Sequence, residues 1–289
     1  MDFKQVSDHS WYAHSRLYEY NSGIIESDGL VWLIDPGMTP DEVIHIREFC
    51  TKQGWEIQAV LITHFHYDHV LGVNAFDDAI WVTHGCFEAE YTRMKQRNQA
   101  AIDRLVAGGD MNLPPWGWDV TSDWQINRTQ SFLINDLEVL VIPLPGHTAD
   151  QIGVFIPRDG SLFAADTLSD LEIPFLSFDA LAYQKSLEKL RRYTLERIVP
   201  GHGCPSLGAV ESRERIQRDL VYIRVLRRMV KRLLGGGASL EQVREACADI
   251  PIILPDDNFG PHTWNIESIF LEMGGDAGEE KIGWEREWD

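Results

Sequence analysis

Four side chains that bind metal ions well lie within six residues in the first quarter of the chain. Residues 63–69 read Thr-His-Phe-His-Tyr-Asp-His, which places His64, His66, Asp68 and His69 close together. Neutral imidazole and carboxylate groups suit zinc and other borderline divalent ions. A lone histidine is usually structural, but ordinary packing gives no reason for four such groups in one short segment. The spacing therefore predicts a metal site.

The ligand segment lies between an expected strand and an expected helix. Residues 57–62 form an apolar, β-prone run, and residues 70–76 have the composition of a short helix. Three further candidate ligands, His147, Asp166 and His202, also lie where expected strands meet loops. Pro and Gly residues beside the two histidines allow tight turns and close approach. We therefore expect all of these side chains to converge on one cavity at a sheet edge.

The expected strands and helices fall into two comparable halves. Strands are expected at 14–34, 57–62, 79–83, 137–142, 152–156, 161–166 and 197–199. Helices are expected at 39–54, 87–106 and 179–192, and after residue 206 the apolar residues again recur at helical spacing. This order predicts an α/β (α+β) fold in which two mixed sheets pack face to face with helices outside.

Composition limits the classes of partner. The 289 residues carry a net charge of −19, which argues against nucleic acid or an anionic membrane as partner and suits a neutral or cationic substrate. The four cysteines form no Cys-x-x-Cys pair, so we expect reduced thiols; Cys204 is notable because it lies two residues after His202. No signal pattern and no membrane-spanning apolar run is present, so we expect a cytoplasmic protein.

Several other residues are candidates for the cavity. Trp116 and Trp118 belong to a Gly- and Pro-rich segment, where they either line the cavity or fold onto the core. His262 and Trp264 are weaker candidates from the C-terminal part, and Tyr67 lies beside the ligands. Residues 211–232 hold eight Arg or Lys residues against three acids, a stripe that is either a solvated face or an anion-binding surface.

The order of the candidate ligands resembles that of a known family. An H-x-H-x-D-H segment followed by a histidine, an aspartate and a histidine resembles the metallo-β-lactamase superfamily over about residues 15–205. The resemblance implies an αββα sandwich with two divalent metal ions at one edge, zinc first, with iron and manganese as alternatives. It also implies that residues 1–206 form a catalytic domain and that residues 207–289 form a helical region covering the active site.

The same resemblance assigns a role to each candidate ligand. The first ion would be held by His64, His66 and His147. The second ion would be held by Asp68, His69 and His202. Asp166 would bridge the two ions, and Asp35 would hold one of the ligands in position by a hydrogen bond.

Within the superfamily, the resemblance is closest to the glyoxalase II-like branch, the hydroxyacylglutathione hydrolases and their relatives. That branch has the bridging aspartate, whereas classical β-lactamases commonly have a cysteine where Asp166 stands. The chain departs from the branch after His147, because Thr-Ala-Asp-Gln at residues 148–151 replaces Thr-x-Gly-His. The basic residues that hold glutathione in this branch have no matched positions here.

We therefore predict a dinuclear metal hydrolase that uses a metal-bridging hydroxide to cleave a thioester, a lactone or another ester of a small molecule. Asp68 would also relay a proton, and Tyr67 would donate a hydrogen bond to the substrate. The alternatives are a mononuclear iron enzyme similar to persulfide dioxygenases, a ribonuclease of the superfamily, and a non-catalytic ligand-binding regulator. The sequence does not decide between a monomer and a homodimer.

Overall fold

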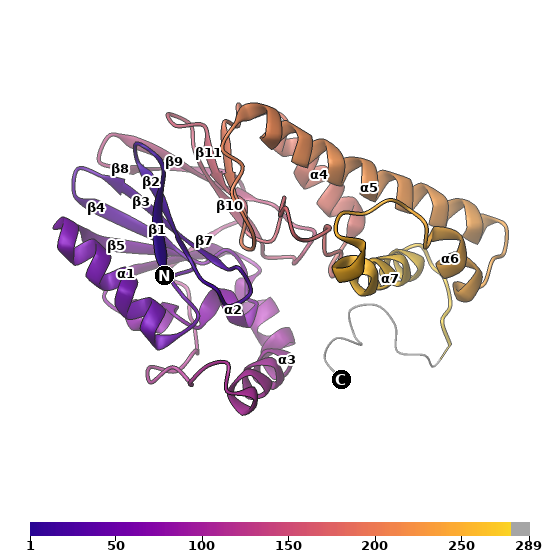
Figure 1. Cartoon of the computed structure of the whole chain (residues 1–289), viewed down its shortest axis with the longest axis horizontal. Helices are drawn as coiled ribbons and strands as arrows, with labels where there is room; N and C mark the ends of the chain where they lie inside the picture. Colours follow the sequence, from indigo (N-terminus) through magenta and orange to yellow (C-terminus); the bar gives the residue numbers. More distant parts are fainter. Residues whose placement is uncertain (279–289) are drawn as a thin grey trace.

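Two β-sheets lie face to face between two layers of helices in the computed structural model, which describes residues 1–278 (Figure 1). The strands are β1 (Asp2–Ser7), β2 (Ser10–His14), β3 (Asn21–Ser27), β4 (Leu30–Ile34), β5 (Glu56–Leu61), β6 (Ile80–His84), β7 (Trp124–Ile126), β8 (Gln130–Ile134), β9 (Leu137–Pro143), β10 (Ile152–Ile156), β11 (Ser161–Phe163) and β12 (Arg197–Val199). The helices are α1 (Pro40–Gln53), α2 (Tyr67–Val70), a 3₁₀ turn (Val73–Phe76), α3 (Phe87–Gly108), α4 (Ala180–Leu190), α5 (Ala209–Gly235), α6 (Leu240–Cys247) and α7 (Pro255–Glu272).

Both sheets are mixed. The first sheet has the order β1-β2-β3-β4-β5-β6-β7, antiparallel from β1 to β4 and parallel from β4 to β7. The second has the order β12-β11-β10-β9-β8, in which the β11–β12 pair is parallel and the other pairs are antiparallel. The prediction of two mixed sheets with outer helices is therefore confirmed.

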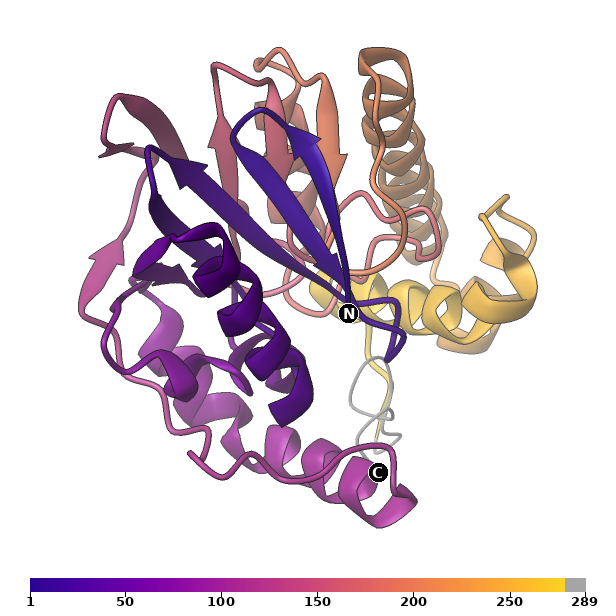
Figure 2. The same ribbon diagram turned by 60° about the vertical axis from the view of Figure 1, so that its left-hand side comes forward.

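Alternating apolar side chains explain the layers. In β4, Trp32 and Ile34 belong to the core between the sheets, whereas Val31 and Leu33 belong to the core under α1 and α3. Successive strand residues face opposite sides, so a strand covered on both faces is apolar throughout. Figure 2 shows α1 and α3 on one side of the sheets and α5 on the other.

The C-terminal helices pack on the outer face of the second sheet. Apolar residues of α5 such as Ile216, Leu220 and Ile223 recur every three or four positions and join one buried cluster with Ile142 and Leu162 of the sheet. In residues 1–278, no helix is long and apolar enough to cross a membrane. The predicted region 207–289 extends past the described residues.

Three local predictions were wrong. The alternating segment 17–20 is a turn and not a strand, with Tyr18 and Glu19 in the left-handed region at φ 56° and 50°. Strands occur instead at β1 and β2, before the expected start at residue 14, and at β7 and β8, where none was expected. The helix after the ligand segment begins at Tyr67, so Asp68 and His69 lie in its first turn rather than before it.

Candidate metal centre

The seven candidate ligands meet at one edge of the two sheets. His64 and His66 follow β5, Asp68 and His69 lie in α2, and the remaining three follow β9, β11 and β12. Their donor atoms form two groups, in each of which all the atoms lie within 4.8 Å of one another. One group contains His64, His66, His147 and Asp166, and the other contains Asp68, His69 and His202. The structure therefore brings together every predicted ligand, in the two predicted sets.

In the first group, three imidazole nitrogens and one carboxylate oxygen face a common point. Nδ1 of His66 lies 3.1 Å from Nε2 of His64 and 3.0 Å from Nε2 of His147. Oδ2 of Asp166 lies 3.5 Å from the His64 nitrogen and 3.3 Å from the His147 nitrogen. Four nitrogen and oxygen donors from three segments of the chain form a ligand set of the kind that holds a zinc ion.

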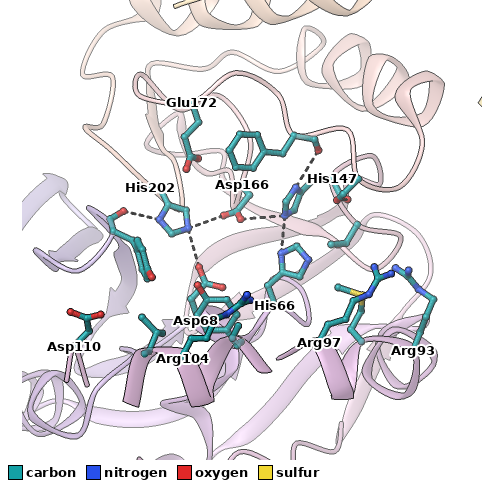
Figure 3. A pocket seen from close by; sticks show the side chains of 18 residues that line it. His66, Asp68, Arg93, Arg97, Arg104, Asp110, His147, Asp166, Glu172 and His202 are labelled. Atoms are coloured by element: carbon teal, nitrogen blue, oxygen red, sulfur yellow. Dashed lines mark hydrogen bonds and ion pairs between the residues drawn. The ribbon is translucent and has the colours of Figure 1, made fainter. Parts of the chain in front are cut away.

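The second group lies on the other side of Asp166. Nε2 of His202 is 3.1 Å from Oδ2 of Asp68, and Nε2 of His69 is 3.5 Å from the same oxygen. The other oxygen of Asp166, Oδ1, lies 3.1 Å from the His69 nitrogen and 3.6 Å from the His202 nitrogen. One carboxylate thus offers a different oxygen to each group, as Figure 3 shows around His147, Asp166 and His202.

Two buried polar atoms at this point lack hydrogen bonds. Nε2 of His69 and Oδ1 of Asp166 have no hydrogen-bond partner among residues 1–278, although they lie 3.1 Å apart. Unpaired buried polar atoms cost about 1–3 kcal/mol each, so they are rare without a reason. A cation between the two groups satisfies both atoms, and the donor set of imidazole and carboxylate therefore fits divalent metal ions.

Hydrogen bonds from behind orient three of the histidines. Nδ1 of His69 lies 2.7 Å from Oδ2 of Asp35, as expected for that aspartate. Nδ1 of His147 lies 3.2 Å from the Phe175 carbonyl oxygen, and Nδ1 of His202 lies 2.9 Å from the Tyr18 carbonyl oxygen. When Nδ1 donates its proton to these oxygens, the lone pair of Nε2 is left to face the centre.

Asp35 also fixes the start of the ligand segment. Its two oxygens accept hydrogen bonds from the backbone N–H of Thr63 at 2.8 Å and from the Thr63 hydroxyl at 2.5 Å. Asp35 itself has φ 45°, in the left-handed region, where a non-glycine residue costs about 1 kcal/mol. The contacts with Thr63 and His69 hold this backbone conformation and explain why the residue comes directly after β4.

Two glycines leave room for the ligands. A Cβ atom on Gly201 would lie 2.3 Å from Oδ1 of Asp166, so only glycine permits the approach of β12 to that carboxylate. Gly146 has φ 152°, and a Cβ atom there would lie 2.3 Å from the backbone of Tyr183 in α4. The Pro-Gly-His segments seen in the sequence are therefore steric requirements of the site.

The departure at residues 148–151 has a structural basis. Oδ2 of Asp150 accepts a hydrogen bond from the backbone N–H of Phe65, at 3.0 Å, in the middle of the ligand segment. Gln151 donates to the Thr167 hydroxyl at 2.7 Å, next to Asp166. Both side chains are buried, and burial raises the pKa of Asp150 to about 7. These two residues thus brace the segments that carry the ligands.

The two groups differ in their electrostatics. Burial lowers the pKa of His64 to about 4, and the pKa of His66 also falls well below its usual value, so both rings are neutral, as metal ligands are. Burial opposes protonation of His202 too, yet the carboxylates of Asp166 and Glu172 raise its pKa to about 10. The second group therefore attracts positive charge, and an ion that binds there displaces protons.

A cavity of about 500 Å³ lies in front of the two groups. His66, Asp68, His147, Asp166 and His202 form its inner wall. The opposite wall is one face of α3 together with Asp110, which follows that helix. The remaining lining residues are Tyr18, Tyr67, Thr148, Glu172, Phe175 and Ser177. Openings of this size accept small molecules rather than folded polymers.

The four substrate-pocket candidates lie outside the cavity. Tyr67 lines the cavity, whereas Trp116, Trp118, His262 and Trp264 are not among its lining residues. Trp116 donates to the Leu71 carbonyl at 2.9 Å, and Trp118 stacks near Phe65 at a ring distance of 6.3 Å. Both tryptophans fold onto the core, which was the alternative to lining the cavity.

His262 is buried under α5 and not over the cavity. Its ring nitrogens lie 2.9 Å from the Tyr222 hydroxyl and 3.0 Å from the Cys247 carbonyl oxygen. His84, at the end of β6, accepts the backbone N–H of Cys86 at 3.1 Å and takes no part in the metal centre. Cys204 is exposed, and its backbone N–H donates to Asp170 rather than its thiol reaching the ligands.

The sequence interpretation missed the residues on the outer wall of the cavity. Arg93, Arg97 and Arg104 of α3 line it, together with Glu172 from the loop before α4. The arginines recur at intervals of four and seven residues, which places them on one helical face. This spacing on one helical face is a signal that the sequence carries, although the denser basic stripe at 211–232 is the stronger pattern.

Comparison with known proteins agrees with the geometry. A model of the metallo-beta-lactamase superfamily matches residues 16–202. The chain belongs to the metallo-β-lactamase superfamily. It is 27% identical to the "Beta-lactamase-like protein 2 homolog" of Drosophila melanogaster over 188 residues, which are 63% of this chain and 58% of that protein. It is 34% identical to a hydroxyacylglutathione hydrolase of Rhizobium etli over 155 residues, 51% of this chain and 48% of that one.

The matched segments therefore span about half to three fifths of the lengths of these relatives. Among solved structures, the sec-alkylsulfatase Pisa1 from a Pseudomonas species matches 94% of this chain and 50% of its own, with a TM-score of 0.76 and 17% identity. A metallo-beta-lactamase from Pontibacter korlensis matches 75% of this chain and 98% of its own, with a TM-score of 0.53 and 20% identity. At these identities the structures show a shared fold, which in the first case extends over the C-terminal helices.

Proposed function

We propose that this superfamily member is a dinuclear metal hydrolase that cleaves a thioester, a lactone or another ester of a small molecule. The observation that carries the proposal is the position of Asp166, whose two oxygens face two separate groups of buried donors. A carboxylate between two such groups is the arrangement expected for two ions that share one ligand. A single-iron enzyme would need only one of the groups.

The proposed ligand roles follow from the two groups. His64, His66 and His147 would hold the first ion, Asp68, His69 and His202 would hold the second, and Asp166 would offer one oxygen to each. When bound, the ions supply an activated water at neutral pH and polarisation of the substrate carbonyl. Five imidazoles and two carboxylates favour zinc, with iron and manganese as alternatives.

The remaining roles belong to side chains around the ligands. Asp68 faces the cavity and is placed to take up a proton as the water attacks, and Tyr67 is placed at the cavity to donate a hydrogen bond to the substrate. Asp35 keeps His69 oriented through its 2.7 Å contact. The hydroxyls of Thr148 and Ser177 also line the cavity, although Ser177 already donates to the His147 carbonyl.

We further propose that residues 1–206 form the catalytic domain. The helical region after it was expected to cover the active site, but its described part, residues 207–278, supplies no lining residue of the cavity, so we propose that this part supports the loop at 172–177 instead. All four cysteines are free thiols, which fits a reducing compartment and a cytoplasmic protein. A small-molecule ester is the proposed partner, and nucleic acid and membrane are not. A homodimer remains compatible with this function.

The test joins metal analysis to substrate turnover. The purified protein is expected to hold two equivalents of metal and to hydrolyse members of a panel of thioesters, lactones and, because the fold is shared with an alkylsulfatase, a secondary alkyl sulfate. His66→Ala should lose the first ion and reduce turnover to background. His45→Ala is the matched control, because His45 is exposed on α1, away from the ligands.

Each competing function has its own outcome. Full metal loading with no turnover across the panel would reject an ester hydrolase and leave a ligand-binding regulator. One iron per chain with oxygen consumption would establish the dioxygenase alternative. Cleavage of RNA at low salt would favour a ribonuclease. Turnover of the alkyl sulfate alone would identify the protein as a sulfate-ester hydrolase and reject cleavage of thioesters and lactones.

A further inference from the structure

The wall of the cavity opposite the metal centre carries an arginine row, which we define as Arg93, Arg97 and Arg104 of α3. All three line the cavity, and Figure 3 shows them on one helix, across from the metal-centre residues. The net charge of the whole chain is −19, so a run of positive side chains at this place is contrary to the overall composition. Such a local reversal of charge at a cavity indicates an anionic ligand.

The three arginines differ in their partners. Arg93 forms an ion pair with Glu90 one turn earlier, at 2.5 Å. Arg97 and Arg104 form no ion pair or hydrogen bond with other residues in the range 1–278. Arg97 is half-buried and Arg104 is exposed. Two guanidinium groups with ten N–H donors between them are therefore available to an anion in the cavity.

The opposite end of the cavity is negative. Glu172 lies on the loop before α4, and Figure 3 shows it beyond His202, on the side away from α3. Its side chain accepts no hydrogen bond from the residues described, whereas its backbone N–H donates to Ser169. On the α3 side, Asp110 also lines the cavity and Glu90 pairs with Arg93, so the three arginines outnumber the two carboxylates there. An anion near Glu172 is repelled, and an anion near Arg97 and Arg104 is attracted. The two ends of the cavity thus differ in charge, and the metal centre lies between them.

The basic stripe at 211–232 does not supply this charge. Arg215 pairs with Glu211 at 2.6 Å, Arg218 with Asp219 at 2.7 Å, and Arg224 with Glu188 at 2.8 Å. No residue of α5 is among those that line the cavity. Three of the stripe's arginines are thus paired with carboxylates and none of its residues lines the cavity, so the positive charge that faces the cavity comes from α3.

We propose that the substrate carries an anionic group, a carboxylate or a phosphate, which Arg97 and Arg104 bind while the reacting carbonyl lies at the metal centre. The proposal rests on the hydrolase function proposed above and adds its substrate class. Arginine suits both groups because its planar fork meets two oxygens at once. Met94, Ala101 and Leu105 lie between and beside the arginines in the lining, and they accommodate a short apolar segment next to the charge.

Three thioesters test the proposal. Butyryl-pantetheine is neutral, succinyl-pantetheine carries a carboxylate on the acyl side, and butyryl-4′-phosphopantetheine carries a phosphate on the leaving-group side. At least one charged thioester should have a kcat/KM about tenfold above that of the neutral one. The combined variant Arg97→Gln/Arg104→Gln should bring this ratio close to one, and Arg97→Lys should retain part of it. The preferred thioester then identifies the anion and the side that bears it.

The matched control is Arg228→Gln, which removes the same charge from an exposed position on α5 outside the cavity. This variant should keep the wild-type ratio. Equal kcat/KM values for all three thioesters in the wild type would overturn the proposal, as would a preference that survives in the double variant. A ratio that falls equally in Arg228→Gln would also overturn it, because the effect would then come from net charge.

A binding measurement separates this proposal from the hydrolase function. Calorimetric titration of the metal-loaded protein with N-ethylsuccinamate, an uncleaved analogue, should give binding about tenfold weaker in the double variant and unchanged in Arg228→Gln. N-ethylbutanamide, without the carboxylate, should bind both proteins alike. If no thioester is hydrolysed but this difference appears, the hydrolase function fails and the anion site stands. If thioesters are hydrolysed without any charge preference, only the anion site fails.

Discussion

The two walls of the cavity are built in different ways. The inner wall carries buried ligands from four separate strand ends, and hydrogen bonds from Asp35, Phe175 and Tyr18 hold its histidines from behind. The outer wall is one face of a single helix, and the arginine row on it is exposed or half-buried. The positions of the inner-wall side chains are therefore set by the fold. The chemistry of the outer wall is set by the residue types on one face of α3.

This difference separates the chemistry of the protein from its choice of substrate. Changing a residue of the inner wall alters ion binding, because each ligand has neighbours that depend on it. Changing a residue of the outer wall leaves the fold and the ligands in place and alters what binds beside them. The superfamily match over residues 16–202 includes both walls, but the family pattern of ligands describes only the inner one.

The strongest test of the inner wall is Asp166→Asn. An amide cannot offer two negative oxygens, so we expect loss of the second ion and a fall in hydrolysis of about a thousandfold. Metal analysis and thermal unfolding measure the two effects separately. Cooperative unfolding should persist, and its loss would mean that Asp166 serves the fold rather than the ions. Asp136→Asn, at an exposed position, is the control.

Asp150 contacts the ligand segment, and its substitution tests whether its titration makes the stability of the protein depend on pH. Its pKa is about 7 when folded, because of burial, against an ordinary value of 3.8. The folded state therefore holds the proton more tightly, and stability falls as pH rises from about 4 to 7. Asp150→Asn removes this titration, so its stability relative to wild type should increase between pH 5 and pH 8, by about 2–3 kcal/mol.

Thermal or urea unfolding in the presence of EDTA measures this difference without a contribution from metal binding. A difference that does not change with pH would show that Asp150 is ionised throughout. The asparagine keeps an oxygen for the Phe65 N–H, so the variant is expected to fold.

Asp35→Asn tests the hydrogen bonds that hold His69 and Thr63 on the side away from the cavity. The amide has a single acceptor oxygen for contacts with Thr63 and His69, and we expect metal affinity to fall by about 10- to 100-fold. Competition with a fluorescent zinc chelator measures the affinity. Full metal affinity in this variant would show that the orientation of His69 comes from the sheet alone, and that the inner wall is less dependent on its neighbours than proposed.

Asn265→Ala tests the loop around residues 174–176, which lines the cavity between the inner and outer walls. The buried Asn265 amide of α7 donates to the Pro174 carbonyl at 2.7 Å and accepts the Leu176 N–H at 2.9 Å. Its loss should reduce the free energy of unfolding by about 2 kcal/mol and raise KM without changing metal content. A lowered metal content would show that the contact of the Phe175 carbonyl with His147 is needed to hold an ion. Thr263→Ala, on the exposed side of α7, serves as the control.

The inner wall could be predicted from sequence because metal ligation fixes residue types. Packing and solubility seldom require histidine and aspartate at set intervals, and Asp166 and His202 could be placed beside His64 by the family pattern alone. The outer wall could not be predicted, because an arginine on a helix is ordinary. Only the docking of α3 against the sheet decides that Arg97 faces the cavity.

The errors in secondary structure have physical causes too. Residues 17–20 alternate like a strand, but Tyr20 is buried and donates to the Asp35 carbonyl at 2.7 Å, which requires the chain to turn. Trp118 lies in a segment that looked suited to a ligand, yet it packs beside Phe65, directly behind the ligand segment. In both cases a long-range contact overrode the local pattern.

Two side chains of α7 hydrogen-bond to the backbone of residues 171–176, in the loop that lines the cavity. Asn258 and Asn265 lie two turns apart, and their amides bind the backbone of Leu171, Ile173, Pro174 and Leu176. Glu172 and Phe175, which line the cavity, belong to this loop. A C-terminal helix exchanged between homologues would therefore shift this part of the cavity rim, and it would reach the metal ligands only through the contact of the Phe175 carbonyl with His147. Divergence of substrate preference in such a lineage is open to changes in residues that never contact the substrate.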